Sequence, residues 1–532
     1  MLQNIPQFLL HHIEETPNKP YLHSHNESIS YSQLYNRIQR TTNGLLEIGI
    51  RSEDTVCIMM DNGPEYLDIW MSLSFLGAIS VPLNVHLKGE GLQYIIQHSE
   101  SKVIFVDHDY LPNVLACLEK IPQSFQVIVI SNEPVGERIV FPHLKIISYA
   151  SLLSNNQSYS LSAVDPGSIH SILYTSGTTG RPKGVMLTHA SFIESARSFA
   201  NQMIGVQQDD ILYTCLPLFH INAQAHTVLG SISKNATIAL SEKFSASKFW
   251  DEIRFYQATI FNSLGSMIHI LCKQPKKQTD RNHSARITAC AATPKEFWRP
   301  FEERFGVQIV EGYGLTETTG FCLSNPLNAS RPPSIGKPYP FVEAKIVDEQ
   351  GEELPPNQRG EIIIRSNKQP FLMKGYYKNP IKTQEVLRDG WFYTGDHGHI
   401  DEDGYLYFYD RHKQCIRRRG ENISSWEIEK IVNQHKKVLD SAAVGVPSDV
   451  GEEDVKLYVV PKKDETLTPE EIIRWCEERM AYFMVPRYIE WMEAFPKTAT
   501  ERIQKFKLKE LGINNAWDRE KMMPKQKEAR KS

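Results

Sequence analysis

The segment that most constrains the fold runs from residue 55 to residue 131, where short apolar runs alternate with longer amphipathic ones. The short runs read TVCIMM, ISVPLN, KVIFVD and QVIVIS, and the longer ones read PEYLDIWMSLSFLG, GLQYIIQHSE and LPNVLACLEKI. Alternation of this kind is typical of parallel strands joined by right-handed helical crossovers. We therefore predict layered α/β structure here, and a second region of the same kind from about residue 205 to residue 312.

The pattern changes after residue 340. The segment EAKIVDEQGEELPPNQRGEIIIRS alternates apolar and polar residues between Gly, Pro and Asn turns, which predicts antiparallel or barrel-like strands. The pair Asp403 and Gly404 predicts a hairpin turn, after which Tyr405, Tyr407 and Tyr409 should share one face of a strand.

The chain becomes basic beyond Arg411 and then returns to mixed helix and strand patterns, which predicts a domain boundary near residue 410. We expect domain 1–410 to contain layered α/β subdomains plus a small β-barrel-like part, and domain 411–532 to be a small α+β domain. The last stretch, DREKMMPKQKEARKS, predicts a solvated, frayed tail.

Composition excludes several classes of protein. A formal charge of −4 argues against a uniformly basic, nucleic-acid-binding surface, and the eight cysteines show no C-x-x-C spacing, which fits a reduced compartment. The N-terminal segment lacks a basic leader and predicts a short amphipathic helix, so we expect a cytoplasmic protein. The weakly charged segment Ile69–Val85 is broken by Gly77 and Pro82, which predicts a buried helix and a strand instead of a membrane span.

A loop rich in Gly, Ser and Thr lies in the segment ILYTSGTTGRPKGVMLTHA, residues 172–190. Backbone N–H groups and hydroxyls in such a loop can surround one anion, because no large side chain blocks its approach. The hydroxyls come from Ser176, Thr178 and Thr179, the room from Gly177, Gly180 and Gly184, and a point charge from Lys183. The sequence predicts a phosphate site, although its spacing is not that of the nucleotide-hydrolase loop. The alternative is a glycine-rich hairpin without a ligand.

Three further motifs accompany this loop: GYGLTET at 312–318, YTGD at 393–396 and YDRHKQCIRRRGENISSWEIE at 409–429. Together and in this order, the four motifs closely resemble those of the adenylate-forming superfamily of acyl-CoA synthetases, luciferases and peptide-synthetase adenylation domains. The resemblance covers almost the whole chain. Within the superfamily, the last motif and the segment PLFHINAQ look most like the crotonobetaine/carnitine-CoA ligase branch.

The resemblance implies a role for each motif in binding ATP. The loop residues Thr175, Ser176, Gly177, Thr178, Thr179, Gly180 and Lys183 would close over the β- and γ-phosphates. In the segment Gly312, Tyr313, Gly314, Leu315, Thr316 and Glu317, the tyrosine would flank the adenine, the threonine would bond the α-phosphate and the glutamate would ligate Mg²⁺.

Asp396 would accept both ribose hydroxyls, and Arg411 would reach the same sugar. Taken singly, these residues have plainer interpretations. Tyr313 could be part of the core, Thr316 and Glu317 the acidic start of a helix, and Asp396 a turn residue.

The resemblance also implies a second surface for CoA. His220 would be a gate between the acyl and CoA sites, with a satisfied interior histidine as the alternative. Lys413 would be the hinge about which a mobile C-terminal domain rotates, and Gly420 would lie beside the pantetheine tunnel. The plainer interpretation of Lys413 is an exposed loop lysine. The segment ACAATP, residues 289–294, has alanines where the superfamily usually has glycine pairs under the adenine.

The chain departs from the superfamily near its C-terminus. Most members have Gly-Lys after a Pro-Lys-Thr stretch, and that lysine bridges the substrate carboxylate and the phosphate, whereas Glu501 and Arg502 stand here. Arg502 keeps the charge in a wider, planar group. Three hypotheses follow: Arg502 acts catalytically, Lys505 or Lys507 replaces it, or the first half-reaction is impaired and the chain is a nucleotide-binding homologue.

The resemblance implies that carboxylate, ATP and CoA give acyl-CoA, AMP and pyrophosphate through an acyl-adenylate, with ATP, Mg²⁺ and coenzyme A as cofactors. Such an enzyme contributes positioning and electrostatic stabilisation, and no dedicated base is needed for a thiol that is already partly ionised. We expect a small-molecule carboxylate as partner, carnitine- or crotonobetaine-like or a short- or medium-chain acid, with no nucleic acid and no membrane span. Transfer to a carrier protein in trans is the alternative.

Overall fold

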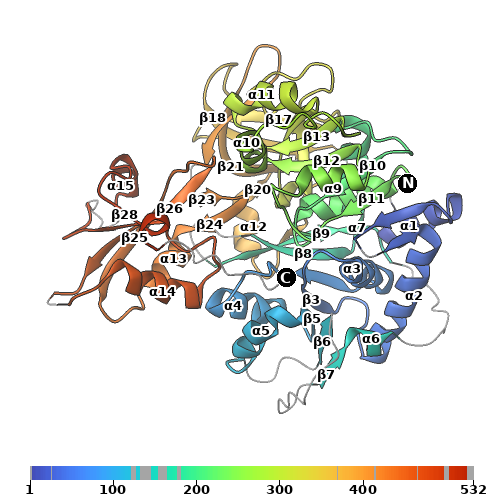
Figure 1. Ribbon diagram of the computed structural model, residues 1–532, viewed down its shortest axis with the longest axis horizontal. Helices are drawn as coiled ribbons and strands as arrows, with labels where there is room; N and C mark the ends of the chain where they lie inside the picture. Colours follow the sequence, from blue (N-terminus) through green and yellow to red (C-terminus); the bar gives the residue numbers. More distant parts are fainter. Residues whose placement is uncertain are drawn as a thin grey trace. The chain divides into compact units, whose positions relative to one another are not determined.

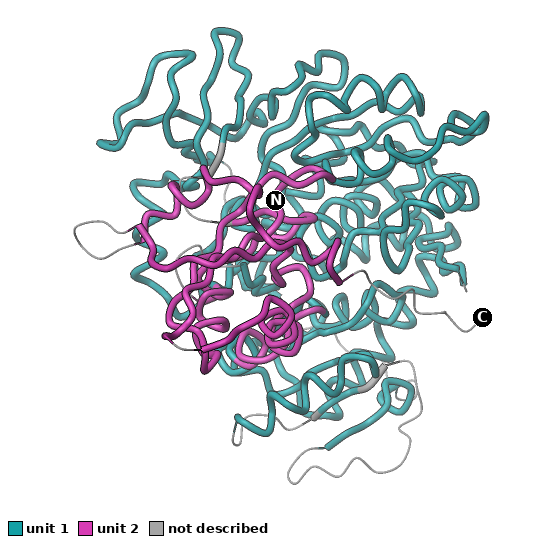
Figure 2. The backbone as a smooth tube through the Cα atoms, turned by 60° about the vertical axis from the view of Figure 1, so that its left-hand side comes forward, with its two compact units in different colours: residues 1–85, 94–175, 183–410 teal, residues 86–93, 176–182, 411–532 magenta. Residues whose placement is uncertain are grey.

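The computed structural model describes residues 3–25, 27–121, 127–131, 145–153, 164–175, 181–367, 370–411, 415–463, 465–496 and 503–523. The chain forms two compact units (Figure 2). The first comprises residues 1–85, 94–175 and 183–410, and the second comprises residues 86–93, 176–182 and 411–532.

The first unit contains an eight-stranded sheet in the order β19-β9-β8-β4-β3-β5-β6-β7 (Figure 1). Its parallel part is formed by β3 (Thr55–Met59), β4 (Ile79–Pro82), β5 (Val103–Asp107), β6 (Val127–Ser131), β7 (Lys145–Ser148) and β8 (Ile169–Thr175). The edge strands β9 (Lys183–Thr188) and β19 (Gly375–Tyr376) are antiparallel. Its crossover helices are α3 (Pro64–Leu76), α4 (Gly89–Ser99) and α5 (Leu111–Leu118). The predicted strand-helix alternation is confirmed.

Helix α3 is buried from Tyr66 to Leu76 and ends at Gly77, which adopts φ 68°. The predicted buried helix followed by a strand is therefore confirmed. Among the described residues, no helix has both the length and the apolar composition that crossing a bilayer requires.

The second sheet of this unit has nine strands in the order β16-β15-β14-β13-β12-β10-β11-β1-β2. Its parallel strands are β1 (Pro20–His23), β10 (Ile211–Thr214), β11 (Thr237–Leu240), β12 (Ile260–Leu264), β13 (Ile287–Ala291) and β14 (Gln308–Leu315). The edge strands β2 (Ser28–Ser30), β15 (Gly320–Ser324) and β16 (Lys337–Pro338) are antiparallel. The predicted second α/β region is confirmed.

Helices surround these two sheets. The predicted N-terminal helix is α1 (Ile5–Glu15), capped by Asn4, and α2 (Tyr31–Glu47) begins with a capping box at Ser30. The others are α6 (Tyr149–Leu152), α7 (His189–Ser198), α8 (Gly230–Ile232), α9 (Phe249–Phe255), α10 (Gly265–Lys273), α11 (Lys295–Phe305), and the π-helices η2 (Phe199–Met203) and η3 (Asn222–Leu229).

A third, five-stranded sheet follows. Its antiparallel strands are β17 (Val342–Val347), β18 (Gly360–Ser366), β20 (Leu387–Arg388), β21 (Trp391–Ile400) and β22 (Leu406–Arg411), with α12 (Pro380–Val386) before β20. The predicted hairpin at Asp403 and Gly404 joins β21 to β22. Tyr407 and Tyr409 both stack on His399, with ring centroids 4.7 and 5.3 Å away, as expected for residues on one face.

The second unit is built on a four-stranded sheet in the order β25-β26-β27-β28. Its strands are β25 (Val438–Pro447), β26 (Glu453–Pro461), β27 (Tyr488–Trp491) and β28 (Trp517–Asp518), beside a hairpin of β23 (Cys415–Arg418) and β24 (Glu421–Ser424). Its helices are α13 (Ser425–Val432), α14 (Pro469–Arg479), α15 (Lys505–Glu510) and α16 (Arg519–Met522).

The prediction of a frayed tail from Asp518 onward is wrong for its first part. Asp518 pairs with Tyr488 across β27 and β28, and its carboxylate receives an ion pair from Arg487 at 3.5 Å. Residues 517–523 therefore belong to the second unit, and the rest of the expected tail, 524–532, lies outside the described residues. Local composition misled here, because the pairing depends on strands distant in sequence.

A buried ionic cluster links the β23–β24 hairpin to this sheet. The Arg418 side chain, in a residue only 2% exposed, donates to the carbonyls of Phe483 and Val485 at 3.0 Å and pairs with Asp454 at 2.8 Å. Asp454 also pairs with Arg487 at 2.9 Å. Burial acts to raise the pKa of the Asp454 carboxyl, but the two guanidinium groups and a hydrogen bond from the Ser448 hydroxyl together hold that pKa below its ordinary value.

We predict that Asp454→Asn lowers the free energy of opening of the second unit by about 3 kcal/mol, because Arg418 then keeps a buried, uncompensated charge. Since the folded pKa of Asp454 is depressed, its contribution is present at neutral pH and lost as pH falls below about 4. Hydrogen exchange of peptides from residues 438–461 measures both effects. Asp449→Asn, which removes an exposed partner of Arg487, should change stability by no more than about 0.5 kcal/mol. Equal losses in the two variants would contradict the prediction.

Candidate active site

Two predicted nucleotide-binding residues contact one another in the first unit. The Tyr313 hydroxyl, on β14, donates to Asp396 Oδ2, on β21, at 2.7 Å, and both residues are buried. The residue expected beside adenine and the residue expected to bind ribose, 83 positions apart, therefore lie together.

The predicted metal ligand and the loop lysine contact a common tyrosine. Glu317 lies in the short 3₁₀ turn η4 (Thr316–Thr318), and its Oε1 accepts a hydrogen bond from the Tyr376 hydroxyl at 2.8 Å. Lys183 donates to the same hydroxyl at 3.3 Å, and its Nζ lies 4.4 Å from the ring centroid. Thr316 is half-buried beside Glu317. Tyr376 was not predictable from the sequence, because no local motif marks a residue that contacts two partners distant along the chain.

The glycine-rich loop joins the strands of a hairpin. Strands β8 (Ile169–Thr175) and β9 (Lys183–Thr188) are antiparallel, and Thr175 lies opposite Lys183. The loop residues Ser176, Gly177, Thr178, Thr179 and Gly180 lie outside the described residues. Gly184 is required by packing, since a Cβ there would lie 2.7 Å from Ile172 Cγ2.

Two glycines of GYGLTE are also required by packing. A Cβ at Gly314 would lie 2.0 Å from the carbonyl oxygen of Gly320, and one at Gly312 would lie 2.8 Å from Phe321 Cδ1. Both contacts are with β15, the antiparallel neighbour of β14. These glycines therefore allow the two strands to pair closely. The close pairing positions Tyr313, the residue between the two glycines on β14.

A buried carboxylate holds the turn after β13. Glu311 Oε1 accepts from the backbone N–H of Ala292 at 2.6 Å, and Oε2 accepts from the N–H of Thr293 at 3.1 Å and from its hydroxyl. Ala292 has φ +61°, the left-handed conformation that favours glycine. The left-handed conformation explains why glycine suits this position of the ACAATP segment. The hydrogen bonds to Glu311 hold the turn in that conformation with alanine at position 292. A charged residue in the otherwise apolar run before GYGLTE was a usable signal for Glu311.

The predicted gate, His220, is half-buried, with its ring 4.7 Å from that of Phe219. The following π-helix η3 carries a second histidine, His226, stacked between Phe199 and Phe321 at 5.0 and 4.6 Å. Burial lowers the pKa of His226 to about 3, so this ring is neutral, and its Nε2 accepts from the Phe321 N–H at 3.2 Å.

Other predicted residues belong to the second unit or lie outside the described part. Arg411 ends β22 but its side chain is outside the described part, as are Lys413 and Arg502. Gly420 has φ +82° in the turn between β23 and β24, and its N–H donates to Glu452 at 2.9 Å. Lys505 pairs with Glu429 at 2.5 Å and donates to Ser425 at 2.8 Å.

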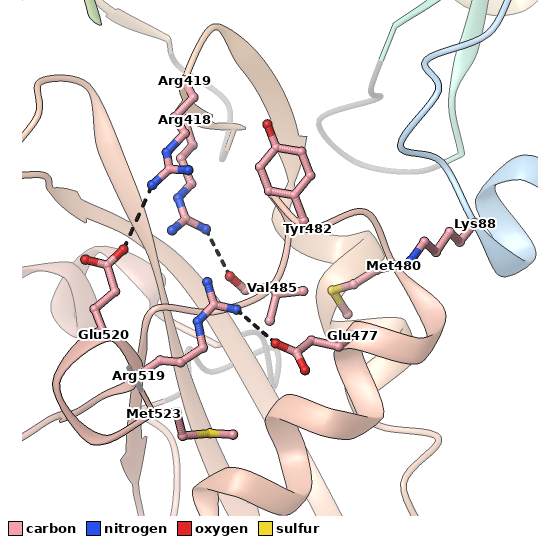
Figure 3. A pocket seen from close by; sticks show the side chains of 10 residues that line it. All are labelled: Lys88, Arg418, Arg419, Glu477, Met480, Tyr482, Val485, Arg519, Glu520 and Met523. Atoms are coloured by element: carbon pink, nitrogen blue, oxygen red, sulfur yellow. Dashed lines mark hydrogen bonds and ion pairs between the residues drawn. The ribbon is translucent and has the colours of Figure 1, made fainter. Parts of the chain in front are cut away.

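The second unit contains a cavity of about 720 Å³ (Figure 3). Two arginines on its wall form long ion pairs: Arg519 with Glu477 at 3.8 Å, and Arg419 with Glu520 at 3.9 Å. The complete lining is Lys88, Arg418, Arg419, Glu477, Met480, Tyr482, Val485, Arg519, Glu520 and Met523. The basic run 411–419 was visible in the sequence, whereas Arg519 was expected in the tail.

Comparison with known proteins places the chain in a family. The model of the AMP-binding enzyme family matches residues 9–377, and that of the AMP-binding enzyme C-terminal domain matches residues 427–502. Crotonobetaine/carnitine–CoA ligases of Salmonella agona and Salmonella typhimurium are each 36% identical over 486 residues, which are 90% of this chain and 93% of theirs.

Solved structures give the same fold. The anthranilate CoA ligase AuaEII in complex with anthranoyl-AMP is 26% identical, with a TM-score of 0.73 over 96% of this chain and 97% of that one. ATP-bound MatB from Rhodopseudomonas palustris is also 26% identical, with a TM-score of 0.69 over 96% and 99% of the two chains.

The chain belongs to the AMP-binding enzyme family. It is an AMP-forming acyl-CoA synthetase, an enzyme that uses ATP, Mg²⁺ and coenzyme A, and the predicted family, α/β fold class and reaction type are confirmed. The buried Glu317 carboxylate is a suitable ligand for Mg²⁺. Among the described residues, no three His, Cys, Asp or Glu side chains form a metal site.

We predict that Glu311→Gln raises the KM for ATP about 10-fold, because an amide N–H then faces the N–H donors of Ala292 and Thr293 and the turn shifts. Steady-state kinetics with varied ATP measures this effect. Glu303→Gln, a substitution of an exposed residue on α11, should leave the KM for ATP unaltered. A folded Glu311→Gln protein with the wild-type KM for ATP would contradict the prediction.

Proposed function

We propose that this enzyme activates a small carboxylate in the cytoplasm, with carnitine- or crotonobetaine-like acids, or otherwise short- or medium-chain acids, as its substrate class. The 36% identity to crotonobetaine/carnitine–CoA ligases over 90% of the chain supports this class. The seven described cysteines with defined side chains are all free, which fits a reduced compartment.

The observation that carries the proposal is the convergence of predicted residues around GYGLTE. Tyr313 donates a hydrogen bond to Asp396. Glu317 accepts one from Tyr376, whose hydroxyl also accepts one from Lys183. We assign adenine to Tyr313 and the ribose hydroxyls to Asp396, with Arg411 reaching the same sugar. Tyr313 can release its hydrogen bond to Asp396 when the ribose hydroxyls donate to that carboxylate.

In this proposal, the loop 175–183 and the turn η4 supply the groups that bind the phosphates. Thr316 donates its hydroxyl to the α-phosphate, Lys183 pairs with the outer phosphates, and Glu317 ligates Mg²⁺. The ion supplies positive charge that neutralises the phosphate oxygens. The residues themselves hold the α-phosphate in line with the attacking carboxylate oxygen and the departing pyrophosphate.

The second half-reaction transfers the acyl group to the thiol of CoA. The thiol forms the thioester bond with the activated carbonyl, and AMP leaves with the bonding electron pair. His220 controls access between the acyl and CoA sites. We take residues 1–410 and 411–532 as the two domains, with Lys413 at the hinge and Gly420 beside pantetheine; the division of contacts after Asp410 supports this boundary.

The arginine-lined cavity of the second unit is the proposed site for the phosphates of CoA. Burial lowers the pKa of Arg519, and the charge of Arg419 lowers it further while Glu477 and Glu520 raise it. An added anion would therefore be favourable for Arg519, and Arg419 lies on the same wall of the cavity. The ion pairs of Arg519 with Glu477 and of Arg419 with Glu520 are long, at 3.8 and 3.9 Å. Each guanidinium group could therefore form shorter, bidentate hydrogen bonds to a phosphate.

We predict that Arg419→Gln raises the KM for CoA about 10-fold and leaves carboxylate-dependent ATP–pyrophosphate exchange unchanged, because exchange needs no CoA. Lys463→Gln removes an exposed charge from the same unit, outside the cavity lining, and should alter neither quantity. An unchanged KM for CoA in the Arg419 variant would contradict the assignment of the cavity to the phosphates of CoA.

We assign the charge that bridges carboxylate and phosphate to Arg502. Lys505 is held by Glu429 and Ser425; burial raises the pKa of that glutamate, and Lys505 offsets this rise only in part. These contacts favour a structural role for Lys505.

We predict that Arg502→Ala slows carboxylate-dependent exchange about 100-fold, since a transition-state charge contact is lost. Lys507→Ala, a change in an exposed residue, should exchange at the wild-type rate. Normal exchange in the Arg502 variant together with its loss in Lys505→Ala would reverse the assignment.

The substrate is tested by ATP–pyrophosphate exchange across a panel of carnitine, crotonobetaine, short, medium and long fatty acids, and aryl acids. Detection of the CoA thioester by mass then names the acid. We expect the highest kcat/KM with carnitine or crotonobetaine, or with a short- or medium-chain acid. Preference for aryl acids would contradict the substrate class. Exchange without a CoA thioester would favour a carrier-protein acceptor, and ATP binding without exchange would favour the nucleotide-binding homologue.

A further inference from the structure

Tyr376 lies between two charged groups that sequence analysis assigned to the phosphates and the metal. It is the second residue of strand β19 (Gly375–Tyr376), and it is 3% exposed. Its hydroxyl donates to Glu317 Oε1 at 2.8 Å and accepts from Lys183 Nζ at 3.3 Å. One buried phenol therefore contacts both side chains.

The backbone around Tyr376 is held from several sides. Strand β19 pairs with β9, so that Tyr376 lies opposite Val185, two residues after Lys183. The N–H of Met373 donates to the carbonyl of Glu317 at 2.8 Å, and that of Tyr376 donates to the Thr383 hydroxyl at 2.9 Å. The phenol is thus fixed relative to both the strand that carries the lysine and the turn that carries the glutamate.

Gly375 allows this close arrangement. Its φ of +141° is unfavourable for other residues, and a Cβ there would lie 3.0 Å from Thr383 Cγ2. The neighbouring N–H groups of Lys374 and Tyr377 donate to Met186 and Gly184, at 2.9 and 2.7 Å. The ring therefore has little freedom to move away from its partners.

The hydrogen-bonding capacities of the three groups suit a positioning role. A phenol donates one hydrogen bond and accepts others, so it can serve a carboxylate and an ammonium at the same time. A carboxylate has a second oxygen, and an ammonium has three donors, so one bond to the phenol orients each group without using up its capacity. The lysine also lies over the ring face, a favourable cation–π contact.

We propose that Tyr376 is a positioning residue that orients Lys183 and Glu317 for Mg·ATP, through its hydroxyl. This inference rests on the proposed function of those two residues. It assigns no contact between Tyr376 and the reacting atoms. AMP lacks the outer phosphates assigned to Lys183, and its binding is not assigned to the metal. Loss of the Tyr376 hydroxyl should therefore weaken the binding of Mg·ATP and not that of AMP.

The test is Tyr376→Phe, which keeps the ring under Lys183 and removes only the hydroxyl. Calorimetric titration of the full chain should show Mg·ATP binding about 10-fold more weakly than to the wild type, with AMP binding unchanged, because two charge-assisted bonds are lost. Tyr377→Phe is the matched control on the adjacent residue and should bind both nucleotides as the wild type does.

The two half-reactions give a second readout. Carboxylate-dependent pyrophosphate exchange should fall with Mg·ATP affinity in Tyr376→Phe, whereas thioester formation from a supplied acyl-adenylate and CoA should proceed at the wild-type rate. Equal weakening of AMP and Mg·ATP binding, or unchanged Mg·ATP binding, would overturn the inference. Failure of the proposed function is distinct, because it would appear as absent exchange in the wild type with every carboxylate.

Discussion

Buried hydrogen bonds from the GYGLTE segment to two other sheets are the constraint on which the site depends. Tyr313 donates to Asp396 on the five-stranded sheet, and Glu317 accepts from Tyr376, which pairs with the eight-stranded sheet. The segment itself begins within β14 of the nine-stranded sheet and ends in the turn η4. The three sheets of the first unit therefore each contribute to one polar region, and a nucleotide bound there would contact groups whose mutual positions the fold already sets.

Much of the fold was predictable, because apolar periodicity and turn residues report local structure. The parallel strands between residues 55 and 131, the second α/β region and the Asp403–Gly404 hairpin follow from such patterns. The pairing of Asp518 with Tyr488 was not predictable from composition, since it depends on a distant strand. Motif resemblance selected Tyr313, Glu317 and Asp396, but not Tyr376 or Glu311, which act by holding other groups.

Several glycines illustrate the same distinction between binding and packing. Gly184, Gly312 and Gly314 lie in segments assigned to the nucleotide, and in each case an added Cβ would clash with the protein itself. Ala292 departs from the glycine expected in its segment and still adopts a left-handed conformation, because Glu311 binds the N–H groups of its turn. Positions that look ligand-determined in sequence are thus also determined by how closely strands and turns approach.

The proposed reaction begins when a carboxylate oxygen attacks the α-phosphate of ATP. The most direct measurement is the mass of AMP formed in complete turnover with a carboxylate labelled with ¹⁸O on both oxygens. Because that oxygen stays on phosphorus when the thiol displaces AMP, the account predicts AMP that carries one labelled oxygen. Unlabelled AMP would contradict this reaction. The formation of ADP together with labelled inorganic phosphate would also contradict it.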